Sequence, residues 1–259
     1  MAGEEKKLTK TFVLSRCVIS LIANSPEVFT GGDEDDDEKV PSDFNVPYMV
    51  YLQSSPEPCV GTLIDPQWVL TAAHCSLPNK IRLGVHQPNI KNENEQIYSY
   101  SVTVIHPYFD AKFLKHDLML IKLSYPATIN TNVGTIAIAM EPMIFNETCF
   151  VPTWTWNNYK NFSDPDILTW TNQYSHSQSY CWKILRQQRQ ETRMNIMCIG
   201  HSLNPMSAIK EVSAAPAICG GRLHGILSWG KAGVTKGSEG FFTEIHPYAR
   251  WILKVMHSH

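Results

Sequence analysis

Three polar residues whose types suit nucleophilic catalysis are spread along the chain. His74 ends the stretch "WVLTAAH", Asp117 begins the stretch "DLMLIKL", and Ser213 lies in the small-residue stretch "KEVSAAPAIC". A serine hydroxyl becomes a nucleophile when a histidine takes its proton and an aspartate holds the imidazole in the required tautomer. Because the three residues are far apart in sequence, this prediction of acyl-transfer chemistry depends on the fold to bring them together.

Each of the three residues also has a plainer interpretation. His74 flanks Cys75 and could simply accompany a structural cysteine. Asp117 precedes an apolar run, where an aspartate often serves as a turn or capping residue. Ser213 sits among alanines and could be a small residue packed in a core. The residues alone leave both interpretations open.

The elements that must position these residues are short strands with frequent turn residues between them. From Val46 onward the apolar runs are separated by Pro, Asn, Gly and Asp, a pattern that predicts an all-β sandwich or barrel. The predicted strands are YMVYL, VGTLI, WVLTAA, KIRLGV, YSVTVI, LMLIKL, TIAIA, HGILSWG and GFFTEI. Two helices are predicted, one over "SYCWKILRQQRQ" and one at the C-terminus, where apolar residues from Trp251 to Met256 recur at helical spacing.

The composition excludes several classes of protein. The 259 residues are 43% hydrophobic and 18% charged with a net charge of −2, which argues for a globular chain without long-range attraction to nucleic acid or anionic membranes. The ten histidines are scattered, and no close pair of cysteines or glycine-rich phosphate loop is present. We therefore expect no metal, no cofactor and no nucleic-acid partner.

Cysteines and glycosylation sequons indicate an oxidising compartment. Six of the seven cysteines follow the acidic run at residues 33–38 and could form three disulfides, while Cys17 precedes it. Asn146 and Asn161 each begin an N-glycosylation sequon. The sequence therefore predicts a secreted, extracellular glycoprotein.

The N-terminal segment, residues 1–43, is predicted to be signal-like and acidic propeptide-like. Its stretch "KKLTKTFVLSRCVISLIANS" has a basic start and an apolar middle that Arg16 interrupts. A degenerate signal peptide and a non-native N-terminus both remain open. The apolar run is too short to span a bilayer, so we expect no membrane span.

From about Val46 to the C-terminus the chain resembles the chymotrypsin/trypsin family of serine proteases. "GTLIDPQWVLTAAHC" looks like the histidine region of the family, "HDLMLIKL" the aspartate region, "PAICGGRLHGILSWG" the strand pair around the serine, and "YARWI" the final helix. Within the family the likeness is strongest to the divergent trypsin-X3 type, also called serine protease 58, in which the serine segment is similarly altered.

The resemblance implies an all-β domain over residues 44–259, built from two six-stranded antiparallel β-barrels that divide near residues 140–146, with a C-terminal helix and a cleft between the barrels. It also implies that His74, Asp117 and Ser213 are the catalytic residues. The implied disulfides are Cys59–Cys75, Cys149–Cys219 and Cys181–Cys198.

The segment around Ser213 departs from the family pattern. Where the family has Gly-Asp-Ser-Gly-Gly-Pro, this chain has the residues from Glu211 to Pro216, "EVSAAP". Glu211 replaces the glycine whose N–H helps to bind the oxyanion, and it adds a carboxylate nearby. Val212 replaces the aspartate that pairs with a newly formed α-amino group after activation cleavage. The residues after Lys39 lack the family's activation sequence too, so both halves of the zymogen switch are altered.

The substrate pocket implied by the resemblance is altered as well. Ile209 and Gly233 replace a pair of cysteines that braces the pocket. Ser207 stands at the pocket base in place of an aspartate, so we expect no preference for Arg or Lys. The pocket walls retain Gly230 and Gly240, which favours a large apolar side chain.

Two functions follow from these residues. Ser228, Trp229 and Gly230 match a segment that pairs with an extended peptide by strand addition. We predict a secreted, monomeric serine endopeptidase homologue that holds an extended peptide or protein in the cleft between the barrels and hydrolyses it weakly or not at all. The alternative is a pseudoprotease that binds such a partner without enzymatic activity. The tryptophan-rich stretch "WTWNNYKNFSDPDILTW" is interpreted as a loop, either a partner surface or a loop with at least two rings packed into the second barrel.

Overall fold

The computed structural model describes residues 45–157, 163–187, 195–200, 210–230 and 239–259. All of them belong to the compact unit Val40–His259. Several sequence predictions fall outside the described residues: the signal-like and acidic segment 1–43, the sequon residue Asn161, and the pocket residues Ser207, Ile209 and Gly233.

The first sheet is antiparallel and has the strand order β5-β4-β1-β2-β3-β7-β6. Its strands are β1 (Met49–Gln53), β2 (Cys59–Asp65), β3 (Trp68–Thr71), β4 (Lys80–Leu83), β5 (Gln96–Tyr98), β6 (Tyr100–Ile105) and β7 (Met119–Leu123). The two end strands β5 and β6 are separated by Ser99 alone, so the sheet curls until its opposite edges are consecutive in the chain.

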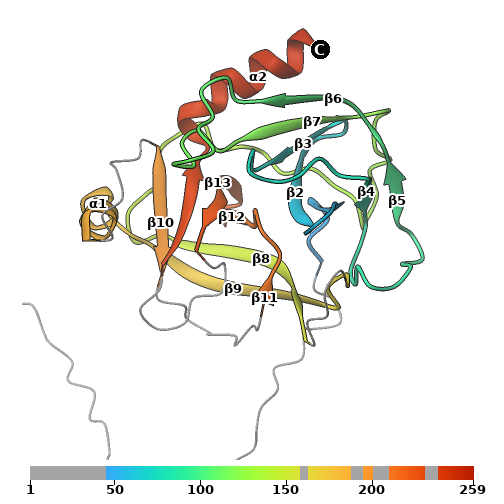
Figure 1. Cartoon of the computed structure of the whole chain (residues 1–259), viewed down its shortest axis with the longest axis horizontal. Coiled ribbons are helices and arrows are strands. Elements are labelled where there is room, and N and C mark those ends of the chain that lie inside the picture. The colour runs from blue at the N-terminus through green and yellow to red at the C-terminus, as the bar shows by residue number, and fades with distance from the viewer. Residues whose placement is uncertain (1–44, 158–162, 188–194, 201–209, 231–238) are drawn as a thin grey trace, which may run out of the picture. The chain divides into compact units, whose positions relative to one another are not determined.

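The second sheet has the order β11-β8-β12-β13-β14-β10-β9. Its strands are β8 (Thr148–Trp156), β9 (Ile167–Ser175), β10 (Ile196–Gly200), β11 (Lys210–Glu211), β12 (Pro216–Cys219), β13 (Arg222–Trp229) and β14 (Gly240–Glu244). An additional pairing of β8 with β9 closes six of these strands into a barrel, and the two strands run side by side in Figure 1.

These sheets confirm the predicted all-β class of two barrel-like units with a C-terminal helix. The helices are α1 (Gln178–Gln187), the short 3-10 helix η1 (His246–Tyr248) and α2 (Ala249–Ser258). Although α2 follows the second sheet in the chain, it lies beside β6 and β7 of the first (Figure 1). Ile252 and Val255 are buried in the core cluster that contains the first sheet's apolar residues, which explains why the apolar face of this helix docks there.

One sequence prediction of local structure was wrong. "TIAIA" forms only an isolated bridge from Ile138 to Leu223. The N–H of Ile136 donates to Leu63 in the first sheet, whereas the N–H of Ala139 donates to Leu223 in the second, so this segment connects the sheets and extends neither.

The tryptophan-rich stretch begins with the end of β8 and finishes with the start of β9, and the described residues between them, 157 and 163–166, are in no strand, so a connection lies there as predicted. Trp154 and Trp156 are buried, as the second of the two interpretations expected. Threonines at positions 153, 155, 169 and 171 are buried in the same strands, and this polar content conceals the strand pattern in the sequence.

Three disulfides cross-link the described part of the chain. They join Cys59 to Cys75, Cys149 to Cys219 and Cys181 to Cys198, which are the pairs that the resemblance implied. Within the described ranges, no helix has the length and apolar character needed to cross a membrane.

Candidate active site

His74 is held by a turn that directly follows β3. The N–H of Cys75 donates to the carbonyl of Ala72 at 3.3 Å, and the disulfide from Cys75 reaches Cys59 at the start of β2. The hydroxyl of Thr71 donates to the carbonyl of Val60 at 2.8 Å. The histidine therefore projects from a turn that is fastened on both sides to β2.

Asp117 lies just before β7 and is fully buried. Its Oδ1 accepts the backbone N–H of His74 at 2.8 Å, and its Oδ2 lies 2.7 Å from His74 Nδ1. The hydroxyl of Ser228, from β13, donates to the same Oδ2 at 2.5 Å. A carboxylate in the interior needs such partners, and these three fix the orientation of the imidazole.

Ser213 lies between β11 and β12, and its backbone is attached to the first sheet. Its carbonyl accepts the N–H of Val60 at 2.8 Å. Its Oγ lies 2.8 Å from His74 Nε2. With Nδ1–H donating to Asp117, Nε2 is left to accept the serine hydroxyl hydrogen, so the geometry fits deprotonation of Ser213 by His74.

Val212 occupies an apolar environment beside this set. It is 1% exposed and belongs to a buried cluster of residues from both sheets. The cluster contains Val46, Met49, Tyr51, Val60, Val85, Trp154, Trp156, Leu168 and Val212. The N–H of Val212 donates to the carbonyl of Trp154 at 2.8 Å, and its carbonyl accepts the hydroxyl of Thr153 at 3.0 Å. The position at which the resemblance implied a charged partner is thus filled by hydrophobic packing.

Glu211 precedes Val212 and Ala214 follows Ser213, and the two residues have different backbone conformations. Glu211 is half-buried and lies opposite Thr155 in the pairing of β11 with β8. Ala214 is fully buried with φ +65°, in the left-handed region that favours glycine. A β-carbon there costs about 1 kcal/mol, so the chain keeps a glycine-type backbone turn after Ser213 without the glycine.

The described residues predicted to bind substrate lie together, where the end of β13 meets the start of β14. Ser228 is buried and bonded to Asp117, a contact that the sequence did not reveal. Trp229 stacks on Phe241 with ring centroids 4.8 Å apart. Gly230 is exposed with φ +87°, and an added β-carbon would lie 2.7 Å from the carbonyl of Glu239, so only glycine fits. Gly240 is buried in β14, where it pairs with Ile199.

A hollow of about 340 Å³ lies beside the serine segment. Its lining comes from the β1–β2 connection, from Asn79 and Lys80, and from Trp156, Ser163, Asp164 and Lys210. The ammonium of Lys210 pairs with the carboxylate of Glu57 across this hollow. Lys210 is three residues before Ser213, so the hollow adjoins the segment that carries the serine.

Among the described residues, one grouping has metal-ligand atoms within reach of one another: Cys59, His74 and Cys75. Its two sulfurs are bonded to each other, and the imidazole is engaged by Asp117 and Ser213. Thiolate is the form of cysteine that binds metal, so this grouping does not fit a metal ion.

Comparisons with known proteins give a consistent result. The family model described as Trypsin matches residues 36–252. The chain is 37% identical over 219 residues to a probable inactive serine protease 58 from Bos taurus, covering 83% of this chain and 90% of that protein. It is 38% identical over 212 residues to serine protease 58 from Homo sapiens, covering 81% and 87%, and 32% identical over 228 residues to trypsin from Sus scrofa, covering 86% and 97%.

Proposed function

The chain belongs to the trypsin family, and from this premise we propose that it is a secreted serine protease homologue with an assembled Ser213–His74–Asp117 set and weak or absent peptide-bond hydrolysis. The observation that carries the proposal is the 2.8 Å approach of His74 Nε2 to Ser213 Oγ, combined with a glutamate two residues before that serine.

The contacts around His74 support a nucleophilic role for Ser213. As the serine oxygen attacks a carbonyl carbon, its proton passes to Nε2 and the imidazole becomes positively charged. Asp117, buried and 2.7 Å from Nδ1, stabilises that charge. Ser228 holds the aspartate in place without touching the reacting atoms.

Glu211 supports weak hydrolysis. The tetrahedral intermediate places negative charge on an oxygen that needs donors, and the loss of one such donor typically lowers turnover by about 10²–10³. The carboxylate of Glu211 adds negative charge to the segment that would have to stabilise the oxyanion. We therefore propose that His74 and Ser213 are well placed for nucleophilic attack, whereas the segment that should stabilise the oxyanion is not.

Binding without hydrolysis is the second candidate, and specific observations favour it. The relatives from Bos taurus and Mus musculus are named "probable inactive" and "putative inactive" serine protease 58. The hollow lined by Lys210 offers room for part of an extended peptide beside the segment that carries Ser213. Secretion is supported by the three disulfides, which persist in oxidising compartments.

The replacement Glu211→Gly tests this proposal. We expect hydrolysis of a mixed peptide library to rise by about 10²-fold or more over the unmodified chain, because the carboxylate and the β-carbon beside the backbone N–H that would bind the oxyanion are removed. The double variant with Ser213→Ala is the control and should be inactive. A Glu211→Gly variant that is folded and hydrolyses nothing would contradict the view that this glutamate is the block.

A further inference from the structure

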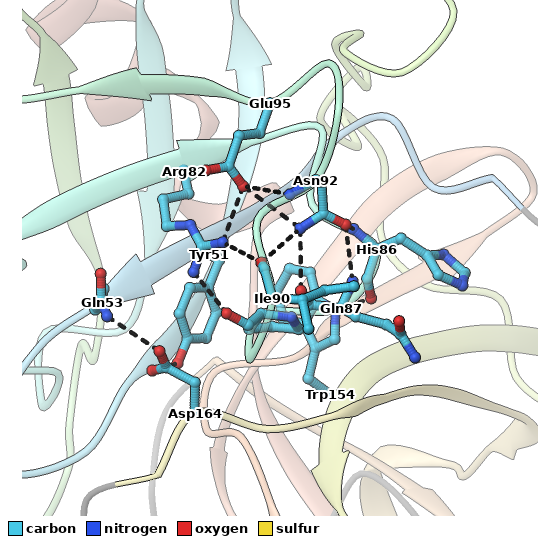
Figure 2. A network of polar contacts seen from close by, with 11 residues as sticks. Tyr51, Gln53, Arg82, His86, Gln87, Ile90, Asn92, Glu95, Trp154 and Asp164 are labelled. Atoms are coloured by element: carbon cyan, nitrogen blue, oxygen red, sulfur yellow. Dashed lines mark hydrogen bonds and ion pairs between the residues drawn. The ribbon is translucent and has the colours of Figure 1, made fainter.

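A buried arginine organises the loop between β4 and β5. Arg82, in β4, is 7% exposed. Its Nη1 donates to the carbonyl of Pro88 at 2.7 Å, and its Nη2 donates to the carbonyl of Ile90 and to Glu95 Oε2, both at 2.9 Å. Figure 2 shows Ile90 and Glu95 in contact with this guanidinium. The side chains of Arg82 and Glu95 are 9% and 6% exposed, so the ion pair is shielded from water.

The chemistry of this arrangement is that of a cation site. Carbonyl and carboxylate oxygens are the ligands that a hard cation such as Ca²⁺ takes, and here a guanidinium occupies the point where they converge. Asn92 completes the loop: its Oδ1 accepts the N–H groups of His86 and Gln87, and its Nδ2 donates to the carbonyls of Gln87 and Ile90. The loop is therefore folded around a cation that the chain itself supplies.

Glu95 depends on Arg82 for its charge. Burial alone raises the pKa of Glu95, but the hydrogen bond and the positive charge of Arg82 outweigh burial and hold that pKa below its usual value. Replacement of Arg82 by a neutral residue would leave a buried carboxylate with an uncompensated charge. The loop would then lose both its ion pair and two carbonyl contacts.

The loop is bonded to the second sheet. The indole N–H of Trp154, in β8, donates to the carbonyl of His86 at 3.1 Å (Figure 2). The N–H of Asn89 donates to the carbonyl of Pro165 at 3.1 Å. If the loop lost the guanidinium at its centre, the carbonyl of His86 would no longer be held where it accepts the indole N–H of Trp154.

Tyr51 links the same parts by packing. Its ring meets Trp154 edge-on with centroids 5.4 Å apart, and the guanidinium of Arg82 lies 5.6 Å from the tyrosine centroid. Its hydroxyl donates to Asp164 at 2.7 Å. Burial, and then Asp164, raise the pKa of Tyr51 far above its usual range, so the phenol remains a donor.

Trp154 in turn holds the serine segment. Its carbonyl accepts the N–H of Val212 at 2.8 Å, and the two side chains share one buried apolar cluster with Tyr51. Val212 directly precedes Ser213. A continuous set of contacts thus runs from Arg82 through the loop and Trp154 to the residue next to the proposed nucleophile.

We propose that Arg82 is a positioning residue for Ser213: as a built-in cation it orders the β4–β5 loop, and the loop orders Ser213 through Trp154 and Val212. This inference rests on the proposed function only in treating Ser213 as the reactive residue. It explains how the serine segment can be held where Val212 offers no charged partner for a freed α-amino group.

Hydrogen exchange of the full secreted chain, followed by mass spectrometry, tests the coupling. Arg82→Gln should speed exchange about tenfold or more both in peptides covering the loop and in peptides covering Val212–Ala215, because loss of one partner of a buried ion pair favours local opening. The exchange rates of Arg82→Lys should lie between those of the unmodified chain and those of Arg82→Gln, since an ammonium can pair with Glu95 without bridging both carbonyls. Arg250→Gln replaces an exposed arginine of α2, and its exchange rates should match those of the unmodified chain.

Two milder variants keep the test decisive if Arg82→Gln fails to fold. Glu95→Gln removes the ion pair while retaining the side-chain shape, and Trp154→Phe removes the indole donor to His86 together with part of the buried ring. Both should speed exchange at Val212–Ala215. Faster exchange confined to the loop would overturn the proposal, as would faster exchange of the unmodified loop in the presence of a calcium chelator.

Covalent labelling separates this proposal from the proposed function. If a fluorophosphonate labels Ser213 in the unmodified chain, Glu95→Gln should slow labelling several-fold and Arg250→Gln should not. If the unmodified chain is never labelled, the proposed reactivity of Ser213 fails, while the exchange result still decides whether Arg82 orders the serine segment.

Discussion

At the scale of single residues, the site is built around a buried carboxylate. Asp117 has no exposed surface and accepts hydrogen bonds from two groups of His74 and from the hydroxyl of Ser228. Each donor offsets part of the cost of keeping this group in the interior. The stability of the fold and the orientation of His74 therefore depend on the same few bonds.

Ser228→Ala should lower the free energy of unfolding by about 1–3 kcal/mol, because it removes a donor from a buried acceptor. Urea denaturation measures the change. Ser101→Ala is the matched control: its hydroxyl is on an exposed residue of β6, and its loss should cost less than about 0.5 kcal/mol. Equal, small effects of the two variants would show that the Ser228 contact contributes nothing to stability.

The sequence was enough to single out the site residues, but it did not reveal their contacts or backbone conformations. The three segments with His74, Asp117 and Ser213 carry enough pattern to be singled out. Ser228 was predicted only as a peptide-pairing residue, because a serine inside an apolar strand gives no sign that it faces a carboxylate from another sheet. Ala214 likewise hides a left-handed backbone, since only the folded turn demands φ +65°.

At the scale of elements, the segments before β7 and before α2 meet in a cluster of histidines and aromatic rings. His106 and His116 stack with centroids 5.0 Å apart and an interplanar angle of 16°. Tyr248 and Trp251 pack edge-on against His106. Nδ1 of His116 lies 2.9 Å from the Tyr248 hydroxyl. Asp117 directly follows His116 in the chain, so the cluster supports the segment that carries the buried carboxylate.

These two histidines should make stability depend on pH. Burial, and then the charge of His116, lower the pKa of His106; burial, and then the charge of Lys115, lower the pKa of His116. With both pKa values below the unfolded value of about 6.5, the unfolded chain binds more protons than the folded chain as the pH falls. The stabilisation is therefore complete above about pH 6.5 and decreases below it.

Denaturation at about pH 7.5 and about pH 5.5 checks this dependence. His116→Asn, which keeps a polar group towards Tyr248, should reduce the loss of stability between the two pH values. His259→Gln replaces an exposed terminal histidine and should leave the loss unchanged. A loss that is the same in all three proteins would assign the pH dependence to other groups.

Strand prediction succeeded where apolar residues dominate and failed where tertiary contacts decide. Runs such as "YMVYL" and "LMLIKL" became β1 and β7. "TIAIA" has the composition of a strand, yet its backbone bonds pass from the first sheet at Ile136 to the second at Ala137 and Ala139. The strands β8 and β9 carry buried threonines, so their alternation is visible only once the barrel is closed.

At the scale of the whole described domain, Ser213 depends on both sheets. Its carbonyl is bonded to β2 of the first sheet, its neighbour Val212 is bonded to β8 of the second, and the cluster around Val212 contains residues of both. The contacts that place the serine are therefore apolar packing and backbone hydrogen bonds within the chain. We therefore expect this packing to assemble Ser213 and His74 without prior cleavage of the chain.

Labelling of the intact, secreted chain with a fluorophosphonate probe tests this assembly, with mass spectrometry to locate the adduct and to verify that the chain is uncleaved. We expect slow labelling at Ser213 that Ser213→Ala abolishes. A chain that is folded by circular dichroism but is never labelled, or is labelled only after cleavage following Lys39, would contradict it.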